Sequence, residues 1–229
     1  MKNAMALKAW IRNRSQELKV PPQALLQQYV FERFLVRLEQ STYARSFYLK
    51  GGGLISAFVG IAVRSTMDLD FTVQGISLQP SRMESIIREI LAHDDLDFIH
   101  YDFVSLDTIQ EDQEYAGLRI SLEARFETLR IPLKIDLTTG DILTPSGMIC
   151  EYPMIGEDRT LHLYSYNLET MLAEKLETIL SRGVFSTRAR DYYDVYILER
   201  MQGSKIHRSQ LFDALVNTMK RRESDHLIP

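Results

Sequence analysis

Residues 48–73 read YLKGGGLISAFVGIAVRSTMDLDFTV, and this segment joins a glycine run to a pair of aspartates. The pattern predicts a strand end, a turn at residues 51–53, a short apolar helix over 54–59 and a second strand that opens at Asp68. Because glycine has no Cβ atom, the backbone of such a turn can adopt positive φ and approach a bulky anion. The first amide groups of the following helix would face that anion.

Asp68 and Asp70 are two residues apart on the predicted second strand, so their side chains leave the same face about 7 Å apart. Two carboxylates beside a cradle of phosphate size form half of a magnesium site. An Asp-x-Asp pair alone is common at exposed strand ends, and glycine turns before helices are common too. Their combination at strand–turn–helix–strand spacing is much rarer, and it favours nucleotide chemistry.

A third carboxylate, that of Asp136, follows from the alternation of residues 131–137. If Ile135 and Leu137 face the core, Lys134 and Asp136 share the opposite face. A strand placed beside the aspartate pair would bring Asp136 to the same cations. Three carboxylates can hold two metal ions about 3.5–4 Å apart, one activating a hydroxyl and one steadying a pyrophosphate leaving group. Taken alone, Asp136 would be interpreted as an ordinary exposed strand residue.

Lys175 lies in a predicted helix that Asn167 caps and Gly183 ends. It falls on or beside the apolar stripe of that helix. A lysine in such a position usually lays its stem on apolar surface and keeps its ammonium in water. The ammonium can equally reach a triphosphate as a point charge. The sequence leaves both interpretations open.

The segment RARDYYD at residues 188–194 opens the next predicted helix and also allows two interpretations. Arg190 and Asp194 are four residues apart, a spacing that suits a surface ion pair. Two arginines, two aspartates and two tyrosines in seven residues also suit contacts with a nucleotide or RNA, with a base stacked on a tyrosine ring.

The hydrophobic periodicity predicts helices at both ends of the chain and strands in the centre. Helical spacing is found at residues 5–19, 23–39, 81–92, 168–183, 188–201 and 208–219. Alternation by two is found at residues 98–104, 118–126 and 131–137. Ser81 is the predicted N-cap of its helix. We therefore expect an α/β fold of the mixed α+β kind, with a central mixed β-sheet, N-terminal helices and a C-terminal helical bundle, in two domains at residues 1–165 and 166–229.

Composition sets limits on the class of protein. The 229 residues are 25% charged and 45% hydrophobic, as in soluble globular proteins, and the net charge of −4 argues against a uniformly basic nucleic-acid surface. Cys150 is the only cysteine, which excludes an intrachain disulfide and favours a reducing compartment. The charged N-terminal segment resembles neither a signal peptide nor a membrane anchor, so we expect a cytoplasmic protein without a membrane partner. Histidine spacing indicates no zinc site, and no Walker A loop is present.

These segments, in this order, resemble the AbiEii/AbiGii toxin family of bacterial nucleotidyltransferases, within the DNA polymerase β-like superfamily. The family motifs K-G-G-T/S and R-S-x-D-L/I-D-F/L correspond to KGGG at residues 50–53 and RSTMDLDF at 64–71. A strand that carries an Asp and ends in Gly-Asp corresponds to residues 134–141. The motifs A-x-K and R-x-R/K-D-x-x-D correspond to residues 173–175 and 188–194. The resemblance spans Tyr48 to Leu198.

The resemblance implies a nucleotidyltransferase core that transfers a nucleoside monophosphate from an NTP to an acceptor hydroxyl with two Mg²⁺ ions. In some relatives the acceptor is the 3′ end of tRNA, which blocks translation and is countered by a cognate antitoxin. The expected partners are therefore an NTP, an RNA such as tRNA and an antitoxin protein, in a toxin–antitoxin or phage-defence system of the abortive-infection type. The expected metal ligands are Asp68, Asp70 and Asp136, with Asp136 nearest the attacking hydroxyl.

The remaining expected site residues bind phosphates or the acceptor. Phosphate contacts are expected from Gly51, Gly52, Gly53, Arg64 and Ser65. Lys175 would steady the triphosphate, and Asp191 would position Lys175 or the acceptor. Arg188 and Arg190 would contact nucleotide or RNA.

Gly53 departs from the family pattern, which often has Thr or Ser at this position. Phosphate binding would then rely on backbone N–H groups, or on Ser56, Ser65 or Thr66. This departure supports an alternative, a catalytically silent module that binds NTP or RNA. A nucleotide-sugar transferase is a second alternative, because Asp-x-Asp also chelates sugar-nucleotide pyrophosphates. The downstream lysine and Arg-Asp helices argue against it.

Overall fold

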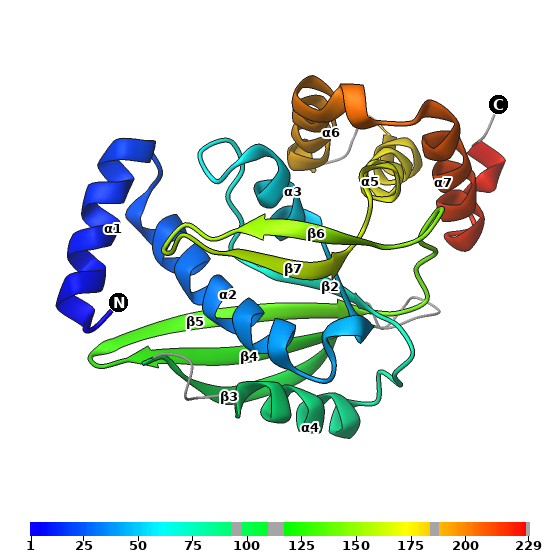
Figure 1. The fold of residues 1–229 in the computed structure, drawn as a ribbon. Helices are drawn as coiled ribbons and strands as arrows, with labels where there is room; N and C mark the ends of the chain where they lie inside the picture. Colours follow the sequence, from blue (N-terminus) through cyan, green and yellow to red (C-terminus); the bar gives the residue numbers. More distant parts are fainter. Residues whose placement is uncertain (93–97, 110–116, 184–187, 228–229) are drawn as a thin grey trace. The chain divides into compact units, whose positions relative to one another are not determined.

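The protein, described here by a computed structural model, is a mixed α/β fold, as predicted (Figure 1). The structure describes residues 1–92, 98–109, 117–183 and 188–227. The chain divides into two compact units. Unit 1 is Met1–Thr139 with Ile149–Tyr164, and unit 2 is Gly140–Met148 with Ser165–Pro229. The division into domains at residues 1–165 and 166–229 stays a prediction.

A mixed β-sheet forms the centre of unit 1. Its seven strands among the described residues are β1 (Phe47–Lys50), β2 (Leu69–Val73), β3 (His100–Ile109), β4 (Gly117–Phe126), β5 (Leu129–Thr138), β6 (Met148–Pro153) and β7 (Thr160–Ser165). They lie in the order β3-β4-β5-β2-β1-β7-β6. β2 runs parallel to β5, whereas the pairs β1–β2, β3–β4 and β4–β5 are antiparallel. The periodicity does not predict β6 and β7.

Helices α2 (Pro22–Gln40) and α4 (Pro80–Leu91) cover one face of this sheet (Figure 1). The ring of Phe34 in α2 lies 6.5 Å from that of Phe71 in β2, measured between centroids. The guanidinium of Arg88 in α4 lies 4.6 Å from the ring centroid of Phe103 in β3. Helix α1 (Ala4–Leu18) packs on α2. The apolar core therefore lies between α2, α4 and this face of the sheet.

Two helix starts differ from the sequence prediction. Helix α3 spans Gly51–Val59, so the three glycines form its first turn and not a separate turn before it. Helix α4 begins at Pro80 with Gln79 as its N-cap and no side-chain capping bond, so the predicted N-cap role of Ser81 is wrong. Proline favours the first helical position because its φ angle is fixed and its missing N–H would be unbonded there.

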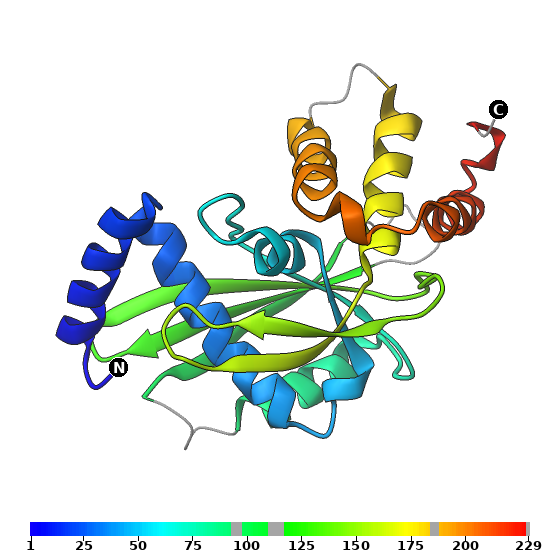
Figure 2. The same ribbon diagram turned by 45° about the horizontal axis from the view of Figure 1, so that its top comes forward.

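Unit 2 consists mainly of helices α5 (Leu168–Arg182), α6 (Ala189–Gln202) and α7 (Arg208–Arg221), and α5 contacts both others (Figure 2). The predicted cap at Asn167 is confirmed, because its Oδ1 accepts a hydrogen bond from the N–H of Thr170 at 2.7 Å. The side-chain amide of Asn167 also donates to the carbonyl groups of Thr144 and Ser146, which fixes the preceding loop to the helix start. Gly183 ends α5 with φ 61°, as predicted.

Short 3₁₀ helices complete the described elements, at Ala44–Ser46, Gly203–Lys205 and Asp225–Leu227. Across the described ranges, none of the helices combines the length and apolarity needed to cross a membrane.

Candidate active site

A row of charged side chains crosses four neighbouring strands of unit 1. Arg119 in β4 is the register partner of Asp136 in β5, Asp136 is the partner of Asp70 in β2, and Asp70 is the partner of Lys50 in β1. Register partners project from the same face of a sheet. The flanking Leu69, Ile135 and Leu137 are fully buried on the opposite, helix-covered face. The predicted placement of Asp136 beside the aspartate pair is therefore confirmed.

Asp68 lies directly before β2 and is half-buried. Its carbonyl oxygen accepts a hydrogen bond from Oγ1 of Thr66 at 3.1 Å, which fixes the chain as it enters the strand. The structure thus brings the three predicted carboxylates to one end of the β2–β5 pair.

Arg119 binds Asp136 through two parallel hydrogen bonds. Its Nε donates to Oδ1 at 2.8 Å and its Nη2 donates to Oδ2 at 2.7 Å. These bonds raise the pKa of Arg119 above its usual value, and the negative charges of Asp136, Asp68 and Asp70 raise it further. The guanidinium of Arg119 therefore interacts electrostatically with all three carboxylates. No sequence motif identifies Arg119 as a site residue.

Lys50 forms the other positive end of the row. Its Nζ donates to Oγ1 of Thr138 at 2.8 Å, and that hydroxyl lies 3.2 Å from Oγ1 of Thr72. Lys50 is the first residue of the KGGG segment, and this position in a motif could have identified it as a site residue.

The glycine run brings the start of α3 against the aspartates. Gly51 has φ 61°, and a Cβ atom there would lie 2.1 Å from Oδ2 of Asp70. A Cβ atom at Gly52 would lie 2.7 Å from Oγ1 of Thr66 and 3.3 Å from Nη2 of Arg64. Arg64 also donates to the carbonyl of Ser65, whose side chain is exposed. Only glycine permits this approach at the first two positions.

The donor set is of the type that magnesium prefers, because carboxylate oxygens are its usual protein ligands. Asp70 and Asp136 lie in register on strands about 4.8 Å apart, which suits a shared cation. However, both carboxylate oxygens of Asp136 are bound by Arg119. Among the residues that the structure describes, no group of three or more His, Cys, Asp or Glu side chains is arranged to hold a metal. The carboxylates fit magnesium chemically, but at Asp136 the guanidinium of Arg119 occupies the position of a metal ion.

A second cluster of charged side chains, in unit 2, is built around Lys175. Nζ of Lys175 lies 2.7 Å from Oδ1 of Asp191 and 3.1 Å from Oδ2 of Asp194. Arg188 also pairs with Asp191, at 2.6 Å. Burial acts to raise the pKa of Asp191, but hydrogen bonds and charges from Lys175 and Arg188 outweigh it and hold the pKa below its usual value.

These contacts bear on two interpretations that the sequence left open. The ammonium of Lys175 is held by two buried carboxylates, so Lys175 is not a lysine that keeps its ammonium in water. Asp194 is fully buried beside Lys175, so a surface ion pair with the exposed Arg190 is wrong as its main role. Asp191 contacts Lys175 as predicted, and its function stays a prediction. Asp194 is a member of the cluster that the sequence analysis missed.

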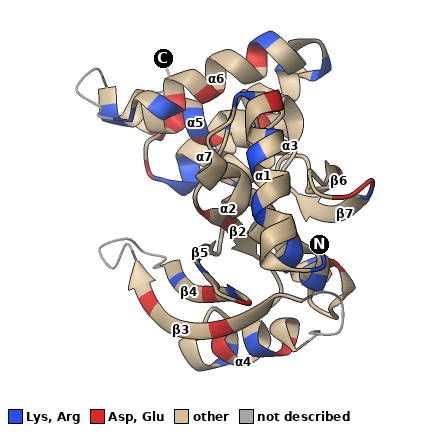
Figure 3. Cartoon of the chain, turned by 90° about the vertical axis from the view of Figure 1, so that its left-hand side faces the viewer, with Lys and Arg blue, Asp and Glu red and all other residues tan. Residues whose placement is uncertain are grey.

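The outer face of α6 carries aromatic and basic residues at four-residue spacing. Tyr192 and Tyr196 are 45% and 53% exposed, and Arg188 and Arg200 continue the same spacing. Nη1 of Arg200 donates to the hydroxyl of Tyr196 at 2.6 Å. Helix α6 carries both basic and acidic residues (Figure 3), with Asp191, Asp194 and Glu199 between Arg190 and Arg200. Both acids of the first turns, Asp191 and Asp194, are buried, so the exposed charge near the tyrosines is largely basic.

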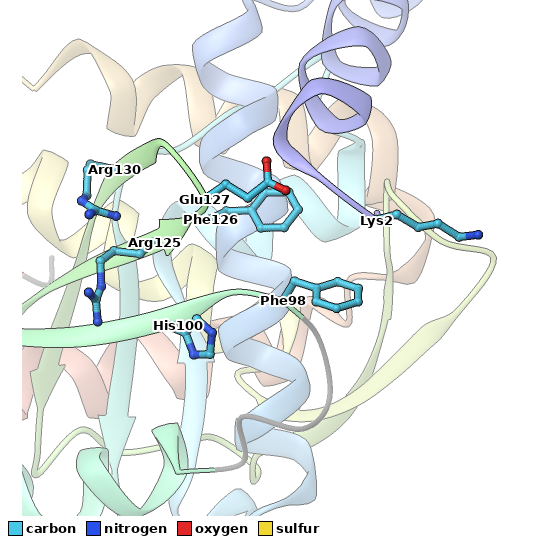
Figure 4. Close-up of a pocket in the computed structure, with 7 residues that line it drawn as sticks. All are labelled: Lys2, Phe98, His100, Arg125, Phe126, Glu127 and Arg130. Carbon is cyan, nitrogen blue, oxygen red and sulfur yellow. The ribbon is translucent and has the colours of Figure 1, made fainter.

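A pocket of about 440 Å³ lies at the far end of the β4–β5 hairpin (Figure 4). It includes Arg125 and Arg130, which pair with Asp102 and Glu123 respectively. Lys2 points away from it (Figure 4). Arg125 is six residues from Arg119 on β4, about 20 Å along the strand. The pocket is therefore separate from the carboxylate row, and its arginines are already neutralised.

Comparisons with known proteins show the fold and the family of this chain. The structure is similar to that of JHP933 from Helicobacter pylori, with a TM-score of 0.56 and 15% identity over 88% of this chain and 80% of that chain. It is also similar to a candidate nucleotidyltransferase from H. pylori, with a TM-score of 0.53 and 17% identity over 92% and 85%. No curated protein sequence matches significantly. Residues 33–229 match the family described as "Nucleotidyl transferase AbiEii toxin, Type IV TA system". With most of its length matched, this chain belongs to the AbiEii family of nucleotidyltransferase toxins of type IV toxin–antitoxin systems.

Proposed function

We propose that this enzyme transfers a nucleoside monophosphate from an NTP to an acceptor hydroxyl. The acceptor oxygen attacks the α-phosphorus, the bond between that phosphorus and the α,β-bridging oxygen breaks, and pyrophosphate leaves. The hydroxyl proton passes to Asp136 or to water. The observation that supports this proposal best is the register match of Asp70 with Asp136 on parallel strands, with Asp68 two residues before Asp70.

Asp68, Asp70 and Asp136 are the proposed ligands of two Mg²⁺ ions. Bound there, Mg²⁺ would activate the attacking hydroxyl and offset the charge of the leaving pyrophosphate. The protein contributes the rigid β2–β5 pair, which fixes the spacing of Asp70 and Asp136 before any substrate binds.

The triphosphate is proposed to bind at the start of α3. Its contacts are the N–H groups of Gly51, Gly52 and Gly53 and the side chains of Arg64 and Ser65. A Cβ atom at Gly53 would lie 3.2 Å from Cδ2 of Leu69, so a larger residue would require Leu69 to shift. This packing accounts for glycine where the family often has a hydroxyl, and it leaves the phosphates to backbone donors.

In unit 2, we assign Lys175 to the triphosphate as a point charge. Asp191 positions its ammonium through the 2.7 Å contact. Arg188 and Arg190, both exposed at the start of α6, are assigned to nucleotide or RNA.

An RNA such as tRNA is the proposed acceptor, through its 3′ end. The exposed face of α6 supports this choice, because tyrosine rings stack on single-stranded bases and arginines attract phosphates. Two such rings with basic residues at the same spacing suit an unpaired RNA end better than a duplex. An antitoxin protein is the proposed regulatory partner, as the type IV toxin–antitoxin family implies.

The test is transfer of label from α-labelled NTPs to total RNA with Mg²⁺, using the wild type, Asp70→Asn and Asp102→Asn. Asp102 is a matched control, because it is a half-buried aspartate on a strand of the same sheet that lies outside the row and pairs with Arg125. We expect Asp70→Asn to lower the rate about 100-fold or more, since a metal ligand stabilises the transition state by several kcal/mol. Asp102→Asn should keep wild-type transfer. Undiminished transfer by Asp70→Asn would contradict the proposal.

A silent NTP- or RNA-binding module is the second candidate. The Arg119–Asp136 pair favours it, because that pair withholds one proposed metal ligand. Mg²⁺-dependent NTP binding without labelled product on any RNA would support the module. Turnover of a UDP-sugar without NTP consumption would instead indicate the nucleotide-sugar transferase.

A further inference from the structure

We propose that Arg119 is a positioning residue that withholds Asp136 from divalent cations until a nucleotide triphosphate draws its guanidinium away. The inference rests on the proposed function and adds to it a substrate-dependent step in the assembly of the site. Arg119 lies outside every motif on which the family resemblance depends.

The geometry of the Arg119–Asp136 pair supports this inference. Arg119 uses two donors on the two oxygens of Asp136, at 2.8 and 2.7 Å. Such a bidentate pair is stronger than a single charged hydrogen bond, and it fixes the orientation of the carboxylate plane. A divalent cation at the same oxygens would stand within a few ångströms of the guanidinium charge. Two cations so close repel strongly at a half-buried site. Arg119 and a second cation therefore compete for Asp136.

The two side chains differ in their exposure to solvent. Asp136 is 17% exposed, whereas Arg119 is 38% exposed and reaches the site from the neighbouring strand. Asp136 is held by β5, which has β4 on one side and β2 on the other. The arginine stem is long and can rotate, so Arg119 is the partner that can move. Exchange of partners therefore requires no change in the sheet.

The chemistry of the proposed substrate also favours an exchange of partners by Arg119. A guanidinium can bind a phosphate with the same bidentate hydrogen-bond geometry that it uses with a carboxylate. A triphosphate carries more negative charge than one aspartate, so it offers Arg119 a better partner. Release of Asp136 then coincides with arrival of the nucleotide. Without nucleotide, the row of Arg119, Asp136, Asp70 and Lys50 balances two positive and two negative charges.

The test measures Mn²⁺ binding to the full chain without nucleotide, by the electron paramagnetic resonance of free Mn²⁺. We compare the wild type with Arg119→Gln and with Arg125→Gln. Arg125 lies on the same strand and face as Arg119, and it also binds an aspartate, Asp102, through two nitrogens. We expect Arg119→Gln to bind Mn²⁺ about tenfold more tightly, or to bind one more ion, because a charged hydrogen-bonded pair no longer competes. Arg125→Gln should match the wild type.

A second measurement separates this role from a structural one. In EDTA, binding of a labelled non-hydrolysable NTP analogue should weaken about tenfold in Arg119→Gln, because one phosphate contact is lost. If Arg119 has a purely structural role, the variant should bind both Mn²⁺ and the NTP analogue more weakly. That result would overturn the inference. Thermal melting checks that the variant is folded. If Arg119→Gln does not fold, Arg119→Lys should show the same two opposite changes at smaller size.

The outcomes also distinguish this inference from the proposed function. Equal Mn²⁺ affinity of folded Arg119→Gln and wild type overturns the inference. If Asp70→Asn still abolishes transfer in that case, the proposed function stands without it. Absence of Mn²⁺ binding in folded Arg119→Gln, together with absence of nucleotide transfer by the wild type, would overturn the two together.

Discussion

Gly51 approaches Asp70 so closely that a Cβ atom at residue 51 would lie 2.1 Å from the carboxylate oxygen Oδ2. The two residues are on adjoining elements, since β1 pairs with β2 and leads directly into α3. The absence of a side chain at residue 51 is therefore a condition for the position of Asp70. The glycine run and the row of charged side chains are therefore in direct contact, although Gly51 and Asp70 are well separated in the sequence.

Gly51→Ala should displace Asp70 and reduce nucleotide transfer about 100-fold or more, as loss of a metal ligand would. Gly75→Ala is the matched control, because Gly75 also has positive φ, at 75°, but a Cβ atom there would meet nothing within 4 Å. Both variants should lose about 1–2 kcal/mol of stability from the left-handed backbone alone. Thermal melting and the labelled-NTP assay check both. Equal activity of the two variants would disprove the role of this contact.

Lys175→Met should destabilise the protein at neutral pH by about 3 kcal/mol, because two buried carboxylates lose their shared cation. In the wild type the pKa of Asp191 is lowered, so its stabilisation is present above the unfolded value of about 3.9 and is lost below it. The difference in the free energy of unfolding between wild type and variant should therefore become smaller in acid. Lys220→Met, which changes an exposed lysine of α7, is the control. Urea denaturation at pH 7 and at about pH 3, below the unfolded pKa, measures this difference in stability.

The sequence predicts the carboxylates but not their counter-ions, and the reason is physical. Alternation along β5 places Asp136 on the face of the sheet that points away from the core, and this holds for any partner strand. Arg119 meets Asp136 only in one register of β4 on β5, and a two-residue turn at Glu127 and Thr128 sets that register. Glu127 has φ 50°, a conformation usually taken by glycine or asparagine in such turns. Without that signal, the pairing cannot be inferred from the pattern.

Asp194 and the strands β6 and β7 were missed for related reasons. Asp194 lies three residues after Asp191, on a helix face that polar composition suggested was exposed. Its burial depends on Lys175, which comes from another helix. β6 and β7 are short strands of six residues each, one at the edge of the sheet. Short strands give few alternations, so the periodic signal is weak.

Tyr196→Ala should raise the KM for the RNA acceptor about fivefold or more and leave the KM for NTP unchanged, because base–aromatic stacking contributes about 1–3 kcal/mol per base. Phe212→Ala is the control, since Phe212 is also an exposed aromatic residue, on α7. Steady-state kinetics with each substrate varied in turn distinguish the two. A matching KM increase in Phe212→Ala would indicate a general surface effect and contradict a stacking site on α6.

Glu32 in α2 is fully buried in unit 1. Its Oε1 accepts hydrogen bonds from Nε2 of Gln28 at 3.1 Å and from the N–H of Ile155 at 2.9 Å. Within the described residues, Oε2 is buried without a hydrogen-bond partner. Burial raises the pKa of Glu32 to about 7, and these bonds only partly oppose that effect.

Folding therefore adds a proton to Glu32 between the unfolded pKa of about 4.3 and the folded value. In that window the folded state binds more protons than the unfolded state, so stability falls as pH rises and levels off above pH 7. Glu32→Gln cannot ionise, so it should remove this slope and gain on the order of 3 kcal/mol over the wild type above pH 7. Glu17→Gln, at an exposed acid of α1, should keep the wild-type slope. Urea denaturation from pH 4.5 to 8 is the measurement, and parallel curves for wild type and Glu32→Gln would show that the carboxylate is ionised in the folded protein throughout.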